Sequence, residues 1–206
     1  MSSNKLHASA ECKLPAPDLA GPLQRLIIQR RSRRNFKRGE LTPAQLALLL
    51  WSAQGCVADS RRAVPSAGAT YPLDVLVALD HPGVTGLAAG LYRYEPAKNA
   101  LLLRRPGNLL HQIVDACYGQ SFIAAAPVVL IIVGELSRIA SRYGDRSRRY
   151  IYMEAGHVGQ NVHLAAESLG LGTVMVGAFD DAELARVLHL PHGHEPVYVF
   201  PIGTPA

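Results

Sequence analysis

The sequence has few cysteines and no long apolar run. Cys12, Cys56 and Cys117 are far apart and form no CxxC pair, so no disulfide framework is expected and a reducing compartment is favoured. The longest apolar run, "APVVLIIVG" at 126–134, is too short to span a bilayer and predicts a buried strand. Residues 1–21 lack the apolar core of a secretory signal. These features predict a cytoplasmic protein that does not associate with membranes.

Several common catalytic motifs are also missing. The chain has no GxGxxG after a strand, no GxxxxGK[ST], no HExxH and no GxSxG, which argues against a Rossmann-type nicotinamide enzyme and a P-loop nucleotide hydrolase. His189, His192 and His194 in "HLPHGH" lack ligand-spaced cysteines or carboxylates, so a solvated loop is preferred to a metal site. His157 and His163 lie on different faces of one predicted helix, so we expect packing or surface roles for them.

The composition is that of a folded protein. Hydrophobic residues make up 49% and charged residues 18% of the 206 residues, which is enough for a substantial core. We expect a loose lead-in at 1–17 and one domain at 18–206. Helical and strand patterns interleave without regular alternation, which predicts the α+β class. The net charge of +5 permits nucleic acid or a small anion as ligand.

Helices and strands can be placed from apolar periodicity and from start and stop signals. Thr42, Pro43 and Gln45 form the pattern of a capping box with proline at the first helical position. Asp180 with Glu183 predicts a second capping box. The expected helices are near 19–31, 43–54, 107–118, 148–169 and from 181, and the expected strands are 73–80, a hairpin at 90–105, 127–134, 172–179 and 195–203.

The segment "RRSRRNFKR" at 30–38, here called the basic segment, places six cations in nine residues. It could be a solvated face, a nucleic-acid surface or a site for one small anion. Arginine forks beside a serine hydroxyl and backbone N–H groups suit a phosphate. A nucleic-acid surface favours spread basic residues with interleaved aromatics, and only Phe36 and Tyr71 are near in sequence. A single small phosphate is therefore the sharper hypothesis, and nucleic acid is not expected as a partner.

Three segments in the same chain order resemble the FMN-dependent nitroreductase family. They are "RRSRRNF" at 30–36, "PSAGATYP" at 65–72 and "EAGHVGQNVHLAAESLGLGTVMVGAFDD" at 154–181. The segment "GLYRYEP" at 90–96 is most similar to the branch of SagB-type and thiazole/oxazole-forming peptide dehydrogenases. The resemblance covers about 25–204. It implies an α+β nitroreductase-like fold, with a mixed and mainly antiparallel sheet flanked by helices, in an intertwined homodimer with FMN at the interface.

The resemblance also implies three groups of FMN-binding residues. Those that hold the phosphate and ribityl chain are Arg30, Arg31, Ser32 and Arg34. Those that approach the flavin ring from the partner subunit are Pro65, Ser66 and Ala67. Those that lie beside flavin N5 are Gly177 and Ala178. In the basic segment, Phe36 is then expected to pack beneath the phosphate, and the solvated remainder is Arg33, Lys37 and Arg38.

The family's activity implies NADH or NADPH as electron donor and a small acceptor, nitroaromatic or quinone-like, or oxidation of a small substrate by the reverse flow. No side chain is assigned as catalytic acid or base, and weak candidates for the pocket lining are Tyr143, Arg149, Tyr150 and Phe179. Many relatives have a late basic residue that "PIGTPA" at 201–206 lacks, so Arg30 and Arg34 would carry more of that charge. The alternative is an FMN-binding partner subunit or peptide azoline dehydrogenase of a modification complex. The Lys-Tyr pair of azoline-oxidising relatives is missing, which counts against azoline oxidation.

Overall fold

The structure is a computed structural model that describes residues 12–57 and 61–206. The helices are α1 (Pro22–Gln29), α2 (Pro43–Gln54), α3 (Leu110–Ala116), α4 (Ser137–Tyr143), α5 (Ser147–Ser168) and α6 (Asp181–Val187). The strands are β1 (Leu73–Leu79), β2 (Gly90–Glu95), β3 (Ala100–Pro106), β4 (Val128–Glu135), β5 (Gly172–Thr173) and β6 (His194–Gly203). Short 3-10 turns include Ala67–Ala69.

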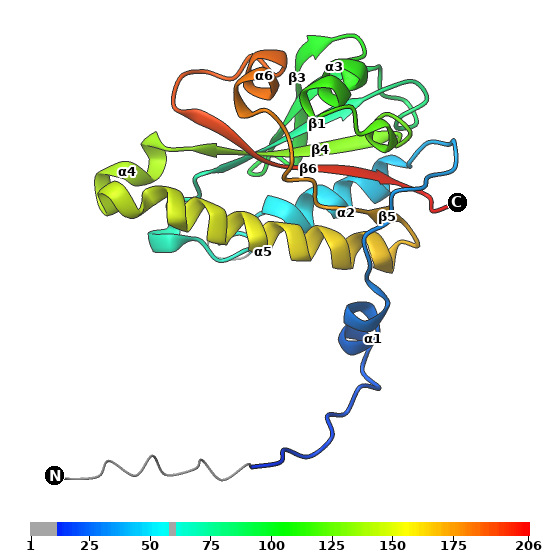
Figure 1. The fold of residues 1–206 in the computed structure, drawn as a ribbon, viewed down its shortest axis with the longest axis vertical. Helices are drawn as coiled ribbons and strands as arrows, with labels where there is room; N and C mark the ends of the chain where they lie inside the picture. Colours follow the sequence, from blue (N-terminus) through cyan, green and yellow to red (C-terminus); the bar gives the residue numbers. More distant parts are fainter. Residues whose placement is uncertain (1–11, 58–60) are drawn as a thin grey trace, which may run out of the picture.

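The strands form one sheet in the order β3-β2-β1-β4-β6-β5, and neighbouring strands pair antiparallel. Helices α2 and α5 cover one face, and α3 and α6 cover the other (Figure 1). Because both faces are covered, β4 is a continuous apolar run whose residues Val128–Gly134 are all buried. The fold is therefore α+β, which confirms the predicted class and the predicted strand at 127–134.

Helix α5 crosses the domain beneath the sheet (Figure 1). Its buried positions include Ile151, Ala155, Val158 and Val162, which follow the three- and four-residue spacing predicted from the sequence. Gly159 lies on the same helix at a close approach: an added Cβ would lie 2.4 Å from Sδ of Met175. Glycine therefore lets the segment after β5 run back along the helix.

The capping box predicted at the start of α2 is confirmed, and the one predicted at the start of α6 is only partly formed. Thr42 and Gln45 form the predicted reciprocal capping box. Asp180 accepts the backbone N–H of Glu183, but the Glu183 carboxylate binds Arg186, so the second predicted box is half formed. An ion pair with an arginine one turn away competes successfully for that carboxylate.

One expected element was wrong, and one helix was not predicted. The strand expected at 172–179 is limited to Gly172–Thr173, and beyond it Val176 alone pairs with Val199. The chain leaves the sheet edge here, and Gly177 and Ala178 are exposed. Helix α4 has no counterpart among the predicted elements; its seven residues follow β4 directly.

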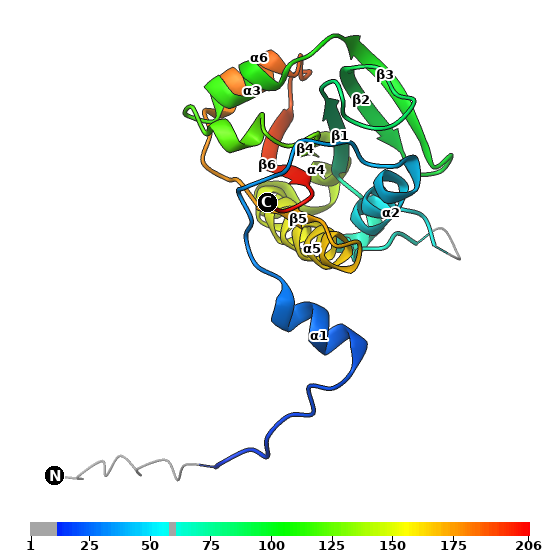
Figure 2. The same cartoon turned by 90° about the vertical axis from the view of Figure 1, so that its right-hand side faces the viewer.

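Helix α1 projects from the domain and contacts it at α5 (Figures 1 and 2). None of its residues is buried, and Leu23, Ile27 and Ile28 are about half exposed. Of the predicted lead-in at 1–17, residues 1–11 lie outside the described residues, and residues 12–17 are exposed without helix or strand. Within the described ranges, no helix is long and apolar enough to cross a membrane.

Candidate functional site

The basic segment is held against the end of the sheet. Ser32 forms a parallel bridge with Thr173 of β5, and the backbone N–H of Arg33 donates to the Thr173 carbonyl at 2.9 Å. Farther along, Phe36 bridges Pro205 and packs against Gly203. Strand β5 comes directly after α5, so the segment is anchored to the chain that leaves this helix.

The side chains of the basic segment divide by direction. The Arg33 guanidinium lies 3.2 Å from the Glu167 carboxylate, and these side chains are 22% and 14% exposed. The prediction that Arg33 is solvated is therefore wrong. Successive residues of an extended segment point to opposite sides, so Arg33 turns inward, whereas Ser32 and Arg34 are exposed. Lys37 and Arg38 are exposed, as predicted.

Positive charge around the segment is not balanced locally. Within residues 12–57 and 61–206, Arg30, Arg31 and Arg34 form no ion pair. The Arg34 guanidinium carbon lies 5.8 Å from the centre of the Phe122 ring, a contact that leaves its N–H donors open. Three guanidinium groups with free donors fit a dianionic phosphate.

Buried polar atoms next to the segment also lack hydrogen-bond partners. They are Nε2 of His163, Oγ1 of Thr173 and Nε of Arg33. Burial, followed by repulsion from Arg30, lowers the pKa of His163 from 6.5 to about 4. An unpaired polar group in a protein interior is costly, and several around one cationic segment fit a site made for an anion. His163 is buried, which is one of the two roles, packing or surface, expected for it.

The loop at 61–72, here called the ring-side loop, contains Pro65, Ser66 and Ala67. Oγ of Ser66 accepts the backbone N–H of Tyr71 at 2.9 Å and closes the loop on itself. From α4, Arg142 donates to the Gly68 carbonyl at 3.0 Å. Arg138 donates to the Tyr71 carbonyl at 3.2 Å. The loop is therefore fixed from outside as well as from within.

The basic segment and residues 65–67 of the ring-side loop lie apart within one chain. Glu154 of α5 lies under the loop, whereas His163 and Glu167 lie near the basic segment. These positions are separated by nine and thirteen residues along the helix, which corresponds to about 14 and 20 Å. The two predicted groups therefore lie toward different ends of α5.

The turn at Gly177 and Ala178 shares neighbours with the basic segment. Nε2 of Gln120 donates to the Ala178 carbonyl at 2.8 Å, and Gln120 is two residues before Phe122, which Arg34 covers. Gly177 borders a cavity of about 320 Å³. The structure thus places this turn and Arg34 beside the same connection between α3 and β4.

The cavity beside Gly177 is lined by aromatic side chains. Phe179 lines it, as do Tyr152 of α5 and Tyr198 of β6, which sequence reasoning missed. No motif marks these tyrosines, because their proximity depends on how β6 packs on α5. The weak candidates Tyr143 and Tyr150 pack on each other instead, with ring centres 4.7 Å apart, and Arg149 is exposed.

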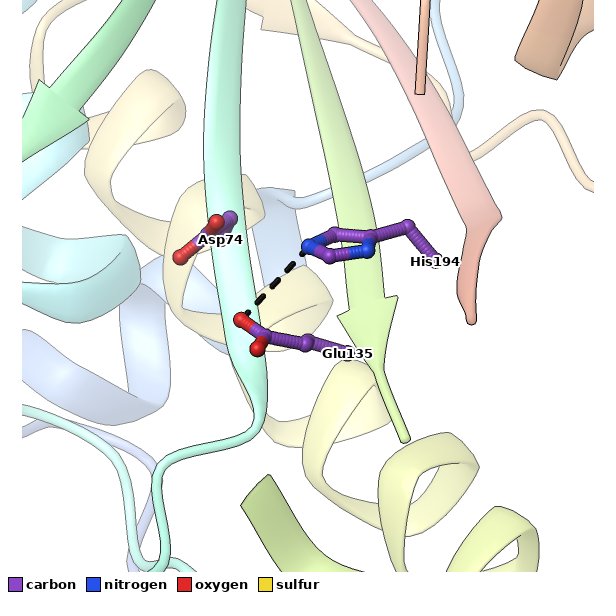
Figure 3. A group of neighbouring side chains, drawn as sticks. All are labelled: Asp74, Glu135 and His194. Atoms are coloured by element: carbon purple, nitrogen blue, oxygen red, sulfur yellow. Dashed lines mark ion pairs between the residues drawn. The ribbon is translucent and has the colours of Figure 1, made fainter. Parts of the chain in front are cut away.

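A separate polar cluster lies where β1 begins, β4 ends and β6 begins, and comprises Asp74, Glu135 and His194 (Figure 3). Nε2 of His194 lies 3.5 Å from a Glu135 oxygen. His194 is half-buried and begins β6, so the prediction of a solvated loop is wrong for this histidine. Arg138 pairs with both carboxylates, which makes the group a salt-bridge network more than a metal site.

Ionisation of Glu135 is favoured within this network. Burial alone would raise the pKa of Glu135, but the hydrogen bond from Ser137 and the charges of Arg138 and His194 lower it overall. The carboxylate therefore stays ionised and keeps Arg138 in place against the Tyr71 carbonyl.

Most of the chain matches a known protein family. Residues 27–204 match the model described as the Nitroreductase family. A protein of Methanocaldococcus jannaschii that is provisionally named a nitroreductase, MJ1384, is 43% identical over 183 residues, covering 88% of this chain and 90% of that protein. The microcin B17-processing protein McbC of Escherichia coli is 29% identical over 135 residues, and the match covers 63% of this chain and about half (49%) of McbC.

Solved structures show the same fold. A crystal structure from Ralstonia eutropha JMP134, also provisionally named a nitroreductase, has a TM-score of 0.79 and 32% identity, covering 94% of this chain and 88% of that one. A chain of the Escherichia coli microcin synthetase McbBCD complex has a TM-score of 0.77 at 20% identity, covering 98% and 79%. At that identity the second likeness is one of fold alone.

Proposed function

The chain belongs to the nitroreductase family, and we propose that it is an FMN-dependent oxidoreductase that passes electrons from NADH or NADPH to a small acceptor. Residues 18–206 would form the FMN-binding domain. For a quinone acceptor, the overall reaction is NAD(P)H + H⁺ + quinone → NAD(P)⁺ + hydroquinone, in which the nicotinamide loses two electrons and the quinone gains them. A nitroaromatic acceptor or a substrate oxidised in the reverse direction would use the same site.

The observation that carries the proposal is the unbalanced charge of the basic segment. Arg30, Arg31 and Arg34 have no acidic partner among the described residues, and the buried polar atoms of His163 and Thr173 beside them lack partners. In the proposal, these arginines and Ser32 hold the FMN phosphate and ribityl chain. Without such an anion, the local repulsion would be uncompensated.

Bound FMN would supply two-electron transfer, and the chain would supply binding, orientation and electrostatics. Gly177 and Ala178 would present backbone beside the reactive edge of the ring. The 320 Å³ cavity at Gly177, with Tyr152, Phe179 and Tyr198 around it, would admit a planar acceptor of modest size. No acid or base of this chain is required, because protons can reach this open cavity from water.

We also propose that the active form is a homodimer. The ring-side loop and the basic segment lie toward different ends of α5, so the loop of one copy can complete the site of another. Helix α1 supports this arrangement, since it leaves apolar side chains exposed. Beside it lies a groove of about 470 Å³ lined by Leu26, Trp51 and Leu164. A second copy would bury these surfaces reciprocally, as a two-fold interface requires.

The likeness to McbC favours a second candidate function. McbC is named as a microcin B17-processing protein, and a structure of the McbBCD complex shares the fold. This chain would then act as a flavin-binding subunit on a peptide substrate, alongside partner proteins. Without a Lys-Tyr pair in this sequence, the small-acceptor reaction is the favoured proposal. In either case free thiols at Cys12, Cys56 and Cys117 fit a reducing cytoplasm.

The proposal is tested by titrating the purified protein with FMN and, in parallel, with riboflavin, which has no phosphate. Tight FMN binding with much weaker riboflavin binding is the expected result. Oxidation of NADH or NADPH should then depend on both FMN and a quinone. A protein that binds neither flavin would refute both candidate functions. Binding without nicotinamide oxidation would favour the partner-subunit alternative.

A further inference from the structure

The ring-side loop has a backbone that needs external support. Gly68, Ala69 and Tyr71 have positive φ values of 58°, 52° and 47°. This left-handed region is strained for residues other than glycine. Ala69 and Tyr71 therefore keep this conformation only because contacts around the loop hold them there.

Part of that support comes from a buried carboxyl group. Glu154 on α5 is only 2% exposed. One of its oxygens, Oε1, accepts a hydrogen bond from Nε2 of Gln54 on α2 at 3.4 Å. The other, Oε2, is buried without a hydrogen-bond partner, and Ser66 of the loop lies near enough to influence the carboxylate. The side chain thus lies beside the loop at Ser66 and binds α2.

A relay continues from Gln54 to the far end of the loop. Oε1 of Gln54 accepts a hydrogen bond from the Arg62 guanidinium at 2.8 Å. The guanidinium carbon of Arg62 lies 4.6 Å from the centre of the Tyr71 ring. Because Gln54 must donate to Glu154 and accept from Arg62, its amide orientation is fixed from both sides.

We propose that Glu154 is a positioning residue for the ring-side loop, and that its carboxylate holds Tyr71 through Gln54 and Arg62. The proposal rests on the FMN-binding function proposed above. A buried carboxyl is an expensive way to fill space beside a loop, and an apolar side chain could not orient Gln54. The hydrogen bonds that link Glu154, Gln54 and Arg62 explain why a carboxyl group is buried at this position.

The ionisation of Glu154 should therefore control how firmly the loop is held. Burial raises the pKa of Glu154, and this rise is reduced by the polar neighbours Ser66 and Gln54 and by the charge of Arg62. Arg62 is the charged group that faces it from the loop; Gln54 faces it from α2, and His157, one turn along α5, is exposed. Protonation would remove the negative charge that attracts Arg62, so the loop loosens as pH falls.

The test measures the affinity for FMN and for riboflavin between about pH 5 and 8, a window that lies above the ordinary carboxyl pKa. Wild-type affinity for both flavins should fall toward acid pH. Glu154→Gln should lower the affinities for FMN and riboflavin by a similar factor, about three- to tenfold at neutral pH. The affinities of this variant should also depend less on pH. Equal effects on the binding of FMN and of riboflavin would show that the substitution acts on the flavin ring and not on the phosphate, because riboflavin has no phosphate.

Two further variants keep the test decisive. Arg62→Gln breaks the same relay at a half-exposed position, so it should weaken the binding of both flavins. Adding Arg62→Gln to Glu154→Gln should lower the affinities little further. Glu183→Gln, in an exposed ion pair on α6, is the matched control and should leave affinity and pH profile unchanged. Wild-type affinity and pH profile in both Glu154→Gln and Arg62→Gln would overturn the proposal while leaving FMN binding intact. Failure of the wild type to bind flavin at any pH would overturn the proposed function itself.

Discussion

The guanidinium of Arg33 lies 3.2 Å from the carboxylate of Glu167, between the basic segment and the last turn of α5. This pair is partly buried and joins residues 134 positions apart in sequence. It separates Arg33, which has a structural role, from Arg30, Arg31 and Arg34, which form no ion pair within the described residues. The distinction decides which substitutions should affect folding and which should affect ligand binding.

The Arg33–Glu167 pair should stabilise the fold more than a surface pair does. In a double-mutant cycle of Arg33→Ala and Glu167→Ala, we expect a coupling energy of about 1–2 kcal/mol, between the values for exposed and buried pairs. The same cycle on the exposed Glu183–Arg186 pair should give a much smaller coupling. Urea unfolding measures both, and equal couplings would contradict the structural role of Arg33.

Arg34 should act on the ligand instead. Losing one charge-assisted phosphate contact costs about 1.5–3 kcal/mol, so Arg34→Ala should weaken FMN binding about 10- to 150-fold. Riboflavin binding should change far less. Lys37→Ala, at an exposed position of the same segment, serves as the control in a fluorescence titration. Unchanged FMN affinity in Arg34→Ala would mean that the phosphate binds elsewhere.

His163 should make the fold sensitive to mild acid. Its pKa is lowered from 6.5 to about 4 in the folded chain, so the unfolded chain binds a proton first as pH falls. This contribution to stability is complete above about pH 6.5 and is lost between there and about pH 4, with a slope of up to about 1.4 kcal/mol per pH unit.

His163→Leu tests that assignment. The free energy of unfolding of the variant, relative to wild type, should rise as pH falls from 6.5 toward 4. For His157→Gln, at an exposed position of the same helix, the free energy of unfolding should depend on pH in the same way as for wild type. If the His163→Leu and wild-type curves were also parallel, the buried histidine would not be neutral in the folded protein as we infer.

Much of the fold could be predicted from the sequence because its signals are local. The capping box at Thr42, the apolar spacing of α5 and the apolar run of β4 each depend on neighbouring residues. The inward direction of Arg33 and the burial of His194 could not be predicted, since Glu167 and Glu135 reach them from distant parts of the chain. The Glu154–Gln54–Arg62 relay could not be predicted from the sequence for the same reason, because it joins α5, α2 and a loop.

The proposed dimer makes a prediction about α1. Ile27→Asp places a charge on the apolar side of this helix, where Ile27 is 49% exposed, and should shift the protein toward the monomer in analytical ultracentrifugation. Gln29→Asp, an exposed polar position on the same helix, should leave association unchanged. A monomeric wild type that binds FMN fully would contradict the shared site.

Mixing two defective variants tests whether the site is shared. Arg34→Ala damages the basic segment, and Arg62→Gln damages the ring-side loop. If each site uses the segment of one copy and the loop of the other, mixed dimers regain one intact site, and tight FMN binding should return to about half the sites of each mixed dimer. No recovery after unfolding and refolding the variants together would place both groups in one copy's site.

In the proposed function, this chain binds FMN and uses it to move electrons from a nicotinamide. The most direct measurement is anaerobic stopped-flow mixing of the FMN-loaded protein with NADH and with NADPH. We predict loss of the oxidised flavin absorbance with at least one of them, and its return when a quinone is added without oxygen. Flavin absorbance that stays unchanged with both nicotinamides would contradict the account.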